Sequence, residues 1–160
     1  MTAASVSHRG PEEGMMSAIE ILLVEDNPDD LALVLRVLRR QDLAHRVEVV
    51  QDGAEALDFL FCTGAYAHHR LEDRPRVILL DLKLSKVTGV EVLQRLKSDP
   101  RTRAIPVVIF SSSAQDRDVM ACYELGANSY ILKPLDMSEL TEAVSQIARY
   151  WLGLNRTTPG

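Results

Sequence analysis

The sequence predicts an α/β fold in which five parallel strands form one sheet with helices on both faces. Short runs of β-branched residues and leucine alternate five times with segments that have helical hydrophobic spacing, which is typical of a parallel sheet with right-handed crossovers. The run that ends at Asp81 is short and wholly apolar, and this indicates a strand buried on both faces.

The first half of the chain contains two strand–helix pairs. Asn27 and Pro28 begin the first helix, because asparagine is a favoured cap and proline suits the first helical position. Leucine and valine residues then recur at the spacing of one buried helical stripe. The predicted pairs are strand 19–24 with helix 28–40, and strand 45–50 with helix 54–61.

The second half contains three more pairs, after a polar connection over residues 62–75 that is longer than usual. Gly126 is a natural C-terminal cap, and Asp136 with Glu139 resembles a capping box for the last helix. The predicted pairs are strand 77–81 with helix 89–97, strand 105–110 with helix 115–125, and strand 129–132 with helix 137–152.

Length and composition limit the remaining possibilities. The 160 residues suffice for one domain, predicted over 19–152, with a disordered leader at 1–18 and a short tail at 153–160. The net charge of −5 gives no reason to expect binding to DNA or to an anionic membrane. The chain shows neither a membrane span nor the apolar core of a signal peptide, and its two cysteines form no metal or disulfide motif. We therefore expect a cytoplasmic protein.

Polar residues follow the predicted strands, and parallel strands place all of them at one edge of the sheet. They are Glu25, Asp26, Asp81, Ser111 and Lys133. Carboxylates about 4 Å apart repel by roughly 4 kcal/mol per pair at an effective dielectric near 20. A hard divalent cation offsets this repulsion, and ligands that are all oxygen favour Mg²⁺ over zinc.

These groups suit the transfer of a phosphoryl group to aspartate. Such a reaction needs a carboxylate nucleophile, a Mg²⁺ ion and a cationic side chain that faces the phosphoryl oxygens. Asp81 is the candidate nucleophile and Lys133 the candidate cation. Ser111 adds a small hydroxyl donor.

Four motifs in this order resemble the receiver domain of two-component response regulators, and the resemblance covers about residues 19–152. The motifs are Val24-Glu25-Asp26-Asn27, Leu80-Asp81, Phe110-Ser111-Ser112 and Lys133-Pro134. The resemblance implies a flavodoxin-like doubly wound sheet of order 2-1-3-4-5. It also implies that a sensor histidine kinase phosphorylates Asp81, and that the protein is no enzyme beyond its own phosphorylation and dephosphorylation.

The resemblance assigns roles to individual residues. Mg²⁺ would be held by Glu25, Asp26, Asp81 and the backbone carbonyl of Lys83, and Lys133 would contact the phosphoryl group. From the residues alone, Pro134 can favour a cis peptide bond after Lys133, and such a bond would aim Lys133.

The resemblance also implies a conformational switch. Ser111 would move toward the phosphoryl oxygens and Tyr130 would turn inward. This would carry the change to the face formed by helix 115–125, strand 129–132 and helix 137–152.

A closer resemblance is to the small regulators encoded with bacterial phytochromes. The loop 62–75, the segment Asn128-Ser129-Tyr130-Ile131 and the ending Tyr150-Trp151-Leu152 are similar to that group. Regulators of this kind often form homodimers through the same helix–strand–helix face. The downstream protein partner is not indicated.

Two single positions and one pair of positions depart from the usual receiver pattern. Ser85 stands where many receivers have proline, and Ser111 replaces the commoner threonine. Lys83 and Ser113 each lie two residues after a site residue, where side chains can shield or admit the hydrolytic water. We expect Lys83 and Ser113 to tune the lifetime of phosphorylated Asp81.

Other functions stay open at this point. The protein could serve as a phosphorelay intermediate or a phosphate sink. Phosphatases of the haloacid dehalogenase type also use a nucleophilic aspartate, but they need a second acid where Lys83 stands. A flavodoxin-type cofactor binder would need a phosphate-binding loop after the first strand, where Glu25 and Asp26 would repel phosphate.

Overall fold

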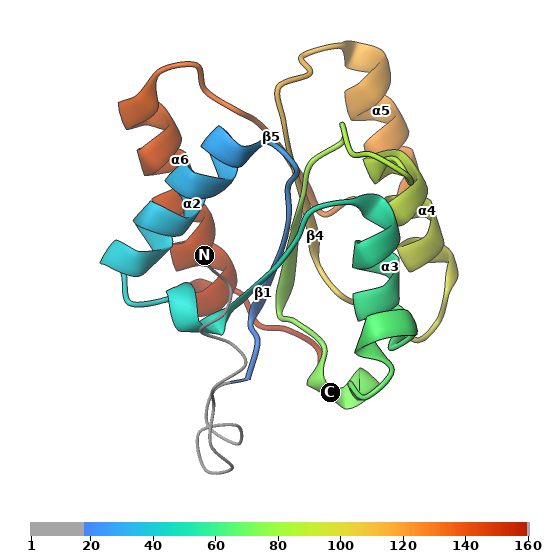
Figure 1. Ribbon diagram of the computed structural model, residues 1–160. Helices are drawn as coiled ribbons and strands as arrows, with labels where there is room; N and C mark the ends of the chain where they lie inside the picture. The colour runs from blue at the N-terminus through green and yellow to red at the C-terminus, as the bar shows by residue number, and fades with distance from the viewer. Residues whose placement is uncertain (1–17, 160) are drawn as a thin grey trace.

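A computed structural model of the chain describes residues 18–159 and shows one five-stranded parallel sheet between two layers of helices (Figure 1). The strand order is β2-β1-β3-β4-β5, which confirms the predicted order 2-1-3-4-5. The strands are β1 (Ile21–Val24), β2 (Val47–Val50), β3 (Val77–Leu80), β4 (Val107–Ser111) and β5 (Ser129–Leu132). The α-helices are α2 (Pro28–Arg40), α3 (Gly53–Phe61), α4 (Gly89–Ser98), α5 (Asp116–Leu125) and α6 (Met137–Arg149).

The two faces of the sheet carry separate apolar cores, because successive strand side chains point to opposite sides. In β1, Ile21 and Leu23 pack with α2 and α6, whereas Leu22 and Val24 pack with α3 and α4. Figure 1 shows α2 and α6 on one side of the sheet and α3, α4 and α5 on the other. Both faces of the central strands are therefore buried, as the apolar run before Asp81 predicts.

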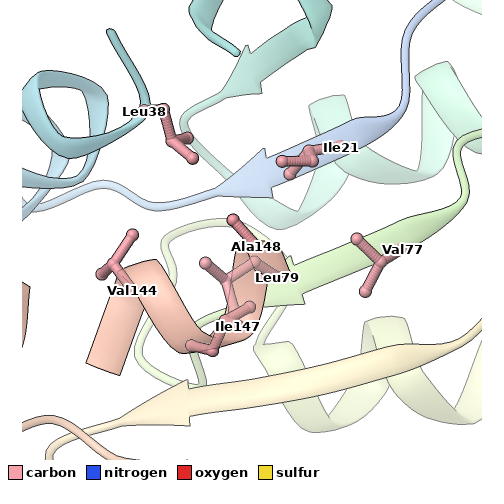
Figure 2. A pocket seen from close by; sticks show the side chains of 7 residues that line it. All are labelled: Ile21, Leu38, Val77, Leu79, Val144, Ile147 and Ala148. Atoms are coloured by element: carbon pink, nitrogen blue, oxygen red, sulfur yellow. The ribbon is translucent and has the colours of Figure 1, made fainter. Parts of the chain in front are cut away.

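Helix α6 lies over β1 and β3 and leaves a small gap there (Figure 2). The gap has a volume of about 10 Å³ and exposes no polar atoms. Its lining residues are Ile21, Leu38, Val77, Leu79, Val144, Ile147 and Ala148. An apolar space of this size does not suit even one water molecule, so we regard it as imperfect packing rather than a ligand site.

Several strand boundaries differ from the prediction by one or two residues, and at the starts of β2 and β4 the reason is hydrogen bonding. Residues 44–46 form a 3₁₀ turn, because the Arg46 N–H donates to the Leu43 carbonyl, and β2 begins only at Val47. Pro106 has no N–H to contribute to a ladder, so β4 begins at Val107. The same strand extends to Ser111, whose carbonyl accepts from the Lys133 N–H at 2.8 Å.

The helix ends also differ in detail. Asp136 caps α6 through the N–H groups of Ser138 and Glu139, while the full capping box occurs in α4 between Thr88 and Glu91. Helix α6 ends at Arg149 and continues as a π-helical turn, Tyr150–Leu154.

The predicted boundaries of the folded domain are only partly covered by the structure. Nearly all of the predicted leader, residues 1–17, lies outside the described residues. Two arginines of the folded domain bond to the predicted tail: Arg76 donates to the Asn155 carbonyl at 3.5 Å, and Arg74 donates to Thr158 Oγ1 at 3.2 Å. Arg76 also donates to the carbonyl of Leu152, the last residue before the tail, at 3.0 Å. Across residues 18–159, no helix has the length and apolar character that a membrane span requires.

Candidate phosphoacceptor site

The acidic residues meet because β1 and β3 are paired in register. Val24 lies opposite Leu80, so Glu25 and Asp81 follow at the same level of the sheet edge. The Asp81 N–H donates to the Val24 carbonyl at 3.1 Å, which continues the ladder by one residue. Both side chains are buried, with 2% and 7% of Glu25 and Asp81 exposed. The predicted convergence at this edge is thus present in the fold.

Asp26 completes the acidic cluster and is itself exposed. One carboxylate oxygen from each of Glu25, Asp26 and Asp81 lies within 4.8 Å of the others. Three hard oxygen donors at this spacing fit Mg²⁺ or Mn²⁺ and do not fit a soft metal. In the described residues this is the single group of three such side chains at metal-binding distances.

Lys133 supplies the positive charge from the end of β5. Its Nζ lies 2.8 Å from Glu25 Oε1, 2.8 Å from Asp30 Oδ2 and 3.2 Å from Asp81 Oδ2. Only 8% of the Lys133 side chain is exposed. The bond between Lys133 and Pro134 is trans, so the cis expectation is wrong, and the carboxylates aim the lysine without it.

Burial and charge act on the ionisation of this cluster in opposite directions. Burial alone would lower the pKa of Lys133, but the hydrogen bonds to Asp30 and Glu25 and the charge of Asp81 raise it above its ordinary value. The pKa of Glu25 is raised to about 7, chiefly by burial and secondarily by Asp81, although the bond from Lys133 opposes the rise. The lysine therefore stays charged at neutral pH, as a group facing phosphoryl oxygens must.

The predicted switch residues are joined by hydrogen bonds through Ser113. The Ser113 N–H donates to Ser111 Oγ at 3.1 Å, and Tyr130 Oη donates to the Ser113 carbonyl at 2.8 Å. The Ser113 hydroxyl donates to Asp118 Oδ2 at the start of α5. Ser111 is fully buried. One residue thus connects the candidate switch serine, the edge-strand tyrosine and a helix.

The loop that follows Asp81 is held close to the site by two glycines. A Cβ on Gly89 would lie 2.2 Å from the Asp81 carbonyl oxygen, and one on Gly53 would lie 1.8 Å from the Val87 carbonyl oxygen. The Lys83 N–H faces Asp81 Oδ1 at 3.4 Å, and the Lys83 side chain is exposed. The loop therefore keeps the Lys83 backbone beside Asp81, and the resemblance to receiver domains implies that the Lys83 carbonyl binds the metal.

Comparison with known proteins assigns the chain to a family. The family model of the response regulator receiver domain matches residues 21–145. The chain belongs to this family. Receiver domains act in two-component signalling with histidine kinases, and they bind Mg²⁺ in an acidic pocket of this kind.

Two curated relatives of this receiver domain are similar over most of their length. The probable methanogenesis regulatory protein FilR2 of Methanothrix harundinacea is 43% identical over 145 residues, 88% of this chain and 87% of FilR2. Response regulator Rcp1 of a Synechocystis strain is 40% identical over 132 residues, 82% of this chain and 88% of Rcp1.

Solved receiver structures show the same fold. The phosphorylated cyanobacterial phytochrome response regulator RcpA is 40% identical with a TM-score of 0.80, and covers 86% of this chain and 96% of its own. The Mn²⁺-bound form of Rcp1 is 38% identical with a TM-score of 0.80, covering 86% and 97%. The bacteriophytochrome response regulator RtBRR is 46% identical with a TM-score of 0.68, covering 88% and 84%.

Sequence reasoning missed Asp30, whose Oδ2 lies 2.8 Å from Lys133 Nζ. The acids in the first turn of α2 are already explained by their favourable position at the positive end of the helix. A second role for one of them, the contact of Asp30 with Lys133, was therefore not predicted. One feature of the sequence could have revealed Asp30: α2 begins three residues after Glu25, so its first turn lies at the same edge of the sheet. Asp118 was missed as well, because only the folded loop brings it to Ser113.

Proposed function

We propose that this receiver accepts a phosphoryl group on Asp81 and thereby switches its contacts with other proteins. The observation that carries the proposal is the Lys133 ammonium, which bonds to Glu25 and Asp81 in one buried cluster. The acidic oxygens that would hold Mg²⁺ and the cation that would face a phosphoryl group therefore surround the same carboxylate.

In the proposed reaction an Asp81 oxygen attacks the phosphorus of a phosphohistidine on a sensor histidine kinase. A P–O bond forms while the P–N bond breaks, and the imidazole takes up a proton as it leaves. Lys133 stabilises the charge that gathers on the phosphoryl oxygens. Glu25, Asp26, Asp81 and the Lys83 carbonyl would hold the Mg²⁺, which when bound neutralises part of that charge.

The switch follows from the hydrogen bonds around Ser113. If Ser111 turns its hydroxyl to a phosphoryl oxygen, the Ser113 N–H loses its present acceptor geometry at Ser111 Oγ. The loop then repacks, and the movement of the Ser113 carbonyl alters its hydrogen bond with the Tyr130 hydroxyl. Phosphorylation adds about −2 charge and new acceptor oxygens at Asp81, enough to bias two packings that differ by a few kcal/mol.

We assign control of the phosphorylated lifetime to Lys83 and Ser113. The exposed Lys83 side chain can cover the approach of water, while Ser113 fixes the loop after β4 through its bond to Asp118. Unchanged dephosphorylation rates in both Lys83→Ala and Ser113→Ala would contradict this assignment.

The partner that we propose upstream is a histidine kinase of the phytochrome type, in the cytoplasm. The support is the similarity to regulators named for phytochromes and bacteriophytochromes. A purified bacteriophytochrome kinase that transfers phosphate to this receiver faster than an unrelated histidine kinase supports the pairing. Equal rates with both kinases contradict it.

We propose a second copy of the chain on the face formed by α5, β5 and α6. This face exposes large apolar side chains, among them Met120, Tyr123, Leu132, Leu135 and Met137. A depression of about 550 Å³ lies between β5 and the end of α6. Native mass measurement should show a dimer that Leu132→Glu dissociates, whereas Leu154→Glu, on an exposed side chain of the π-helical turn, should leave it intact.

The phosphorylation proposal is tested with acetyl phosphate and Mg²⁺, followed by intact mass measurement. Here acetate leaves as the P–O bond to Asp81 forms. We expect a gain of one phosphoryl group, and none in Asp81→Asn or without the metal. An equal gain in Asp81→Asn contradicts the proposal.

A further inference from the structure

The Lys133 ammonium has three protons and three carboxylate partners, and one of these partners has no role in the proposed reaction. Asp81 is the proposed nucleophile, and Glu25 belongs to the acidic cluster with Asp26. Asp30 is neither a nucleophile nor a member of that cluster, yet its Oδ2 lies 2.8 Å from Lys133 Nζ. We propose that Asp30 is a positioning residue that holds the Lys133 ammonium at the phosphoryl site. This inference rests on the proposed function.

The start of α2 aims Asp30 at the lysine. Asn27 Oδ1 accepts from the N–H groups of Asp29 and Asp30 at 2.9 and 3.0 Å, which fixes the first helical turn. In that turn the Asp30 side chain is 30% exposed and faces Lys133, whereas Asp29 is exposed to solvent. Asp29 and Asp30 therefore lie in the same helix turn and carry the same charge, but among these two only Asp30 contacts Lys133 in the described part of the chain.

The need for such a partner follows from the changes at the other two carboxylates. When Asp81 forms an acyl phosphate, Lys133 has to exchange its bond to the Asp81 carboxylate for a bond to a phosphoryl oxygen, and Glu25 is required by the acidic cluster at the same time. A largely buried ammonium cannot give up its ionic partners without a large cost, so it would move toward solvent if none remained. The bond to Asp30 is unaffected by either event. On another side, the Phe110 ring lies with its centroid 5.8 Å from Nζ.

The first test reads the position of Lys133 without any phosphorylation. An amine-acylating reagent is applied to the full chain, and the labelling rate of Lys133 is measured by peptide mass in wild type, Asp30→Asn and Asp29→Asn. Losing the charge of one hydrogen-bond partner should speed labelling about fivefold in Asp30→Asn, equivalent to about 1 kcal/mol. Asp29→Asn, which removes the same charge one residue away, should label at the wild-type rate. Equal rates in all three proteins overturn the proposal.

The second test measures the rate of Asp81 phosphorylation by acetyl phosphate at saturating Mg²⁺. Removing a negative charge should by itself ease the approach of the anion, whereas loss of positioning should slow the reaction. We expect Asp30→Asn to be about fivefold slower, again about 1 kcal/mol, and Asp29→Asn to match wild type. In a Lys133→Met background, Asp30→Asn should have no further effect. A rate in Asp30→Asn equal to or above wild type overturns the proposal.

The two tests also separate this inference from the proposed function. If the protein takes up no phosphoryl group at all, the labelling result still reports whether Asp30 holds Lys133. Thermal unfolding of each variant confirms that it is folded, and Asp30→Ser serves as a second variant if Asp30→Asn is not. Faster labelling combined with normal phosphorylation would show that Asp30 fixes the lysine without serving the reaction, which also overturns the proposal.

Discussion

The Tyr130 hydroxyl donates a 2.8 Å hydrogen bond to the Ser113 carbonyl. This bond connects the edge strand β5 to the loop after β4. In that loop the Ser113 N–H donates to the Ser111 hydroxyl. Tyr130 is half-buried and also packs against the apolar core under α4 and α5. An edge-strand tyrosine and a buried serine are therefore connected through a single backbone residue.

Replacing Tyr130 by phenylalanine should remove that bond and leave the ring packing intact. We expect the free energy of unfolding to fall by about 1 kcal/mol, the usual net value of one such bond. Urea denaturation measures the change. Tyr123→Phe is the matched control, because Tyr123 is half-exposed on α5, and it should unfold like wild type. Equal losses of unfolding free energy in both variants would show that the hydrogen bond to Ser113 does not stabilise the fold.

The exposed Lys83 side chain should slow the hydrolysis of phosphorylated Asp81. Lys83→Ala opens the approach of water, so we expect dephosphorylation about fivefold faster, equivalent to about 1 kcal/mol in the barrier. Lys86→Ala removes the same charge from the same loop, where Lys86 pairs with Asp52 at 3.5 Å. The decay of phosphoprotein after removal of acetyl phosphate compares the variants. Faster decay in Lys86→Ala, with unchanged decay in Lys83→Ala, would show that Lys83 does not shield phosphorylated Asp81.

Gly89 should be required for the loop that carries Lys83. A methyl group there would meet the Asp81 carbonyl oxygen at 2.2 Å, so backbone must move. We expect Gly89→Ala to lose about 1–3 kcal/mol of stability, the usual cost of overpacking, and to bind Mg²⁺ more weakly. Gly153→Ala is the control, since no atom lies within 4 Å of a methyl group there. Calorimetric Mg²⁺ titration and urea denaturation test both effects, and a Gly89→Ala protein with normal values contradicts them.

Lys97, which lies away from the phosphoacceptor site, should make the stability of the protein depend on pH. Its Nζ donates to the carbonyls of Arg103 and Ile105 and to Asn128 Oδ1, and burial lowers the pKa of Lys97 to about 8. Between this value and the ordinary 10.5, the unfolded chain binds more protons than the folded chain, so stability rises with pH. This contribution is lost as the pH falls through the folded pKa.

Urea denaturation of wild type and Lys97→Met isolates the effect of Lys97. The difference in unfolding free energy, wild type minus variant, should grow by about 1 kcal/mol from about pH 7 to about pH 10. The modest size reflects the partial exposure of Lys97. A difference that stays constant or shrinks over this range contradicts the expected sign.

The sequence pattern was sufficient for the parallel sheet and for the edge where the chemistry lies, and the resemblance to receiver domains added the strand order. Strand runs, helix caps and alternation depend on neighbouring residues, and parallel pairing then brings Glu25, Asp81 and Lys133 together without knowledge of any distance. The elements that were placed wrongly are those set by single hydrogen bonds, such as the 3₁₀ turn before Val47. The bond between Lys133 and Pro134 was also misjudged, because either isomer is compatible with the sequence.

The missed site contacts share a physical cause. Asp30 and Asp118 both lie in the first turn of a helix, where an acid is already favourable for the helix itself. Which of two adjacent acids turns toward the site depends on the helix phase, fixed for Asp30 by the Asn27 cap. Such contacts require the folded backbone, whereas the convergence of strand ends does not.

The proposed function requires that Asp81 itself carries the phosphoryl group, and the position of the acyl phosphate in the chain can be mapped. After treatment with acetyl phosphate and Mg²⁺, borohydride reduction converts a phosphorylated aspartate to homoserine, which peptide mass analysis locates. We expect homoserine at position 81 and nowhere else. Homoserine at position 26 or 30 with aspartate intact at 81 would contradict it.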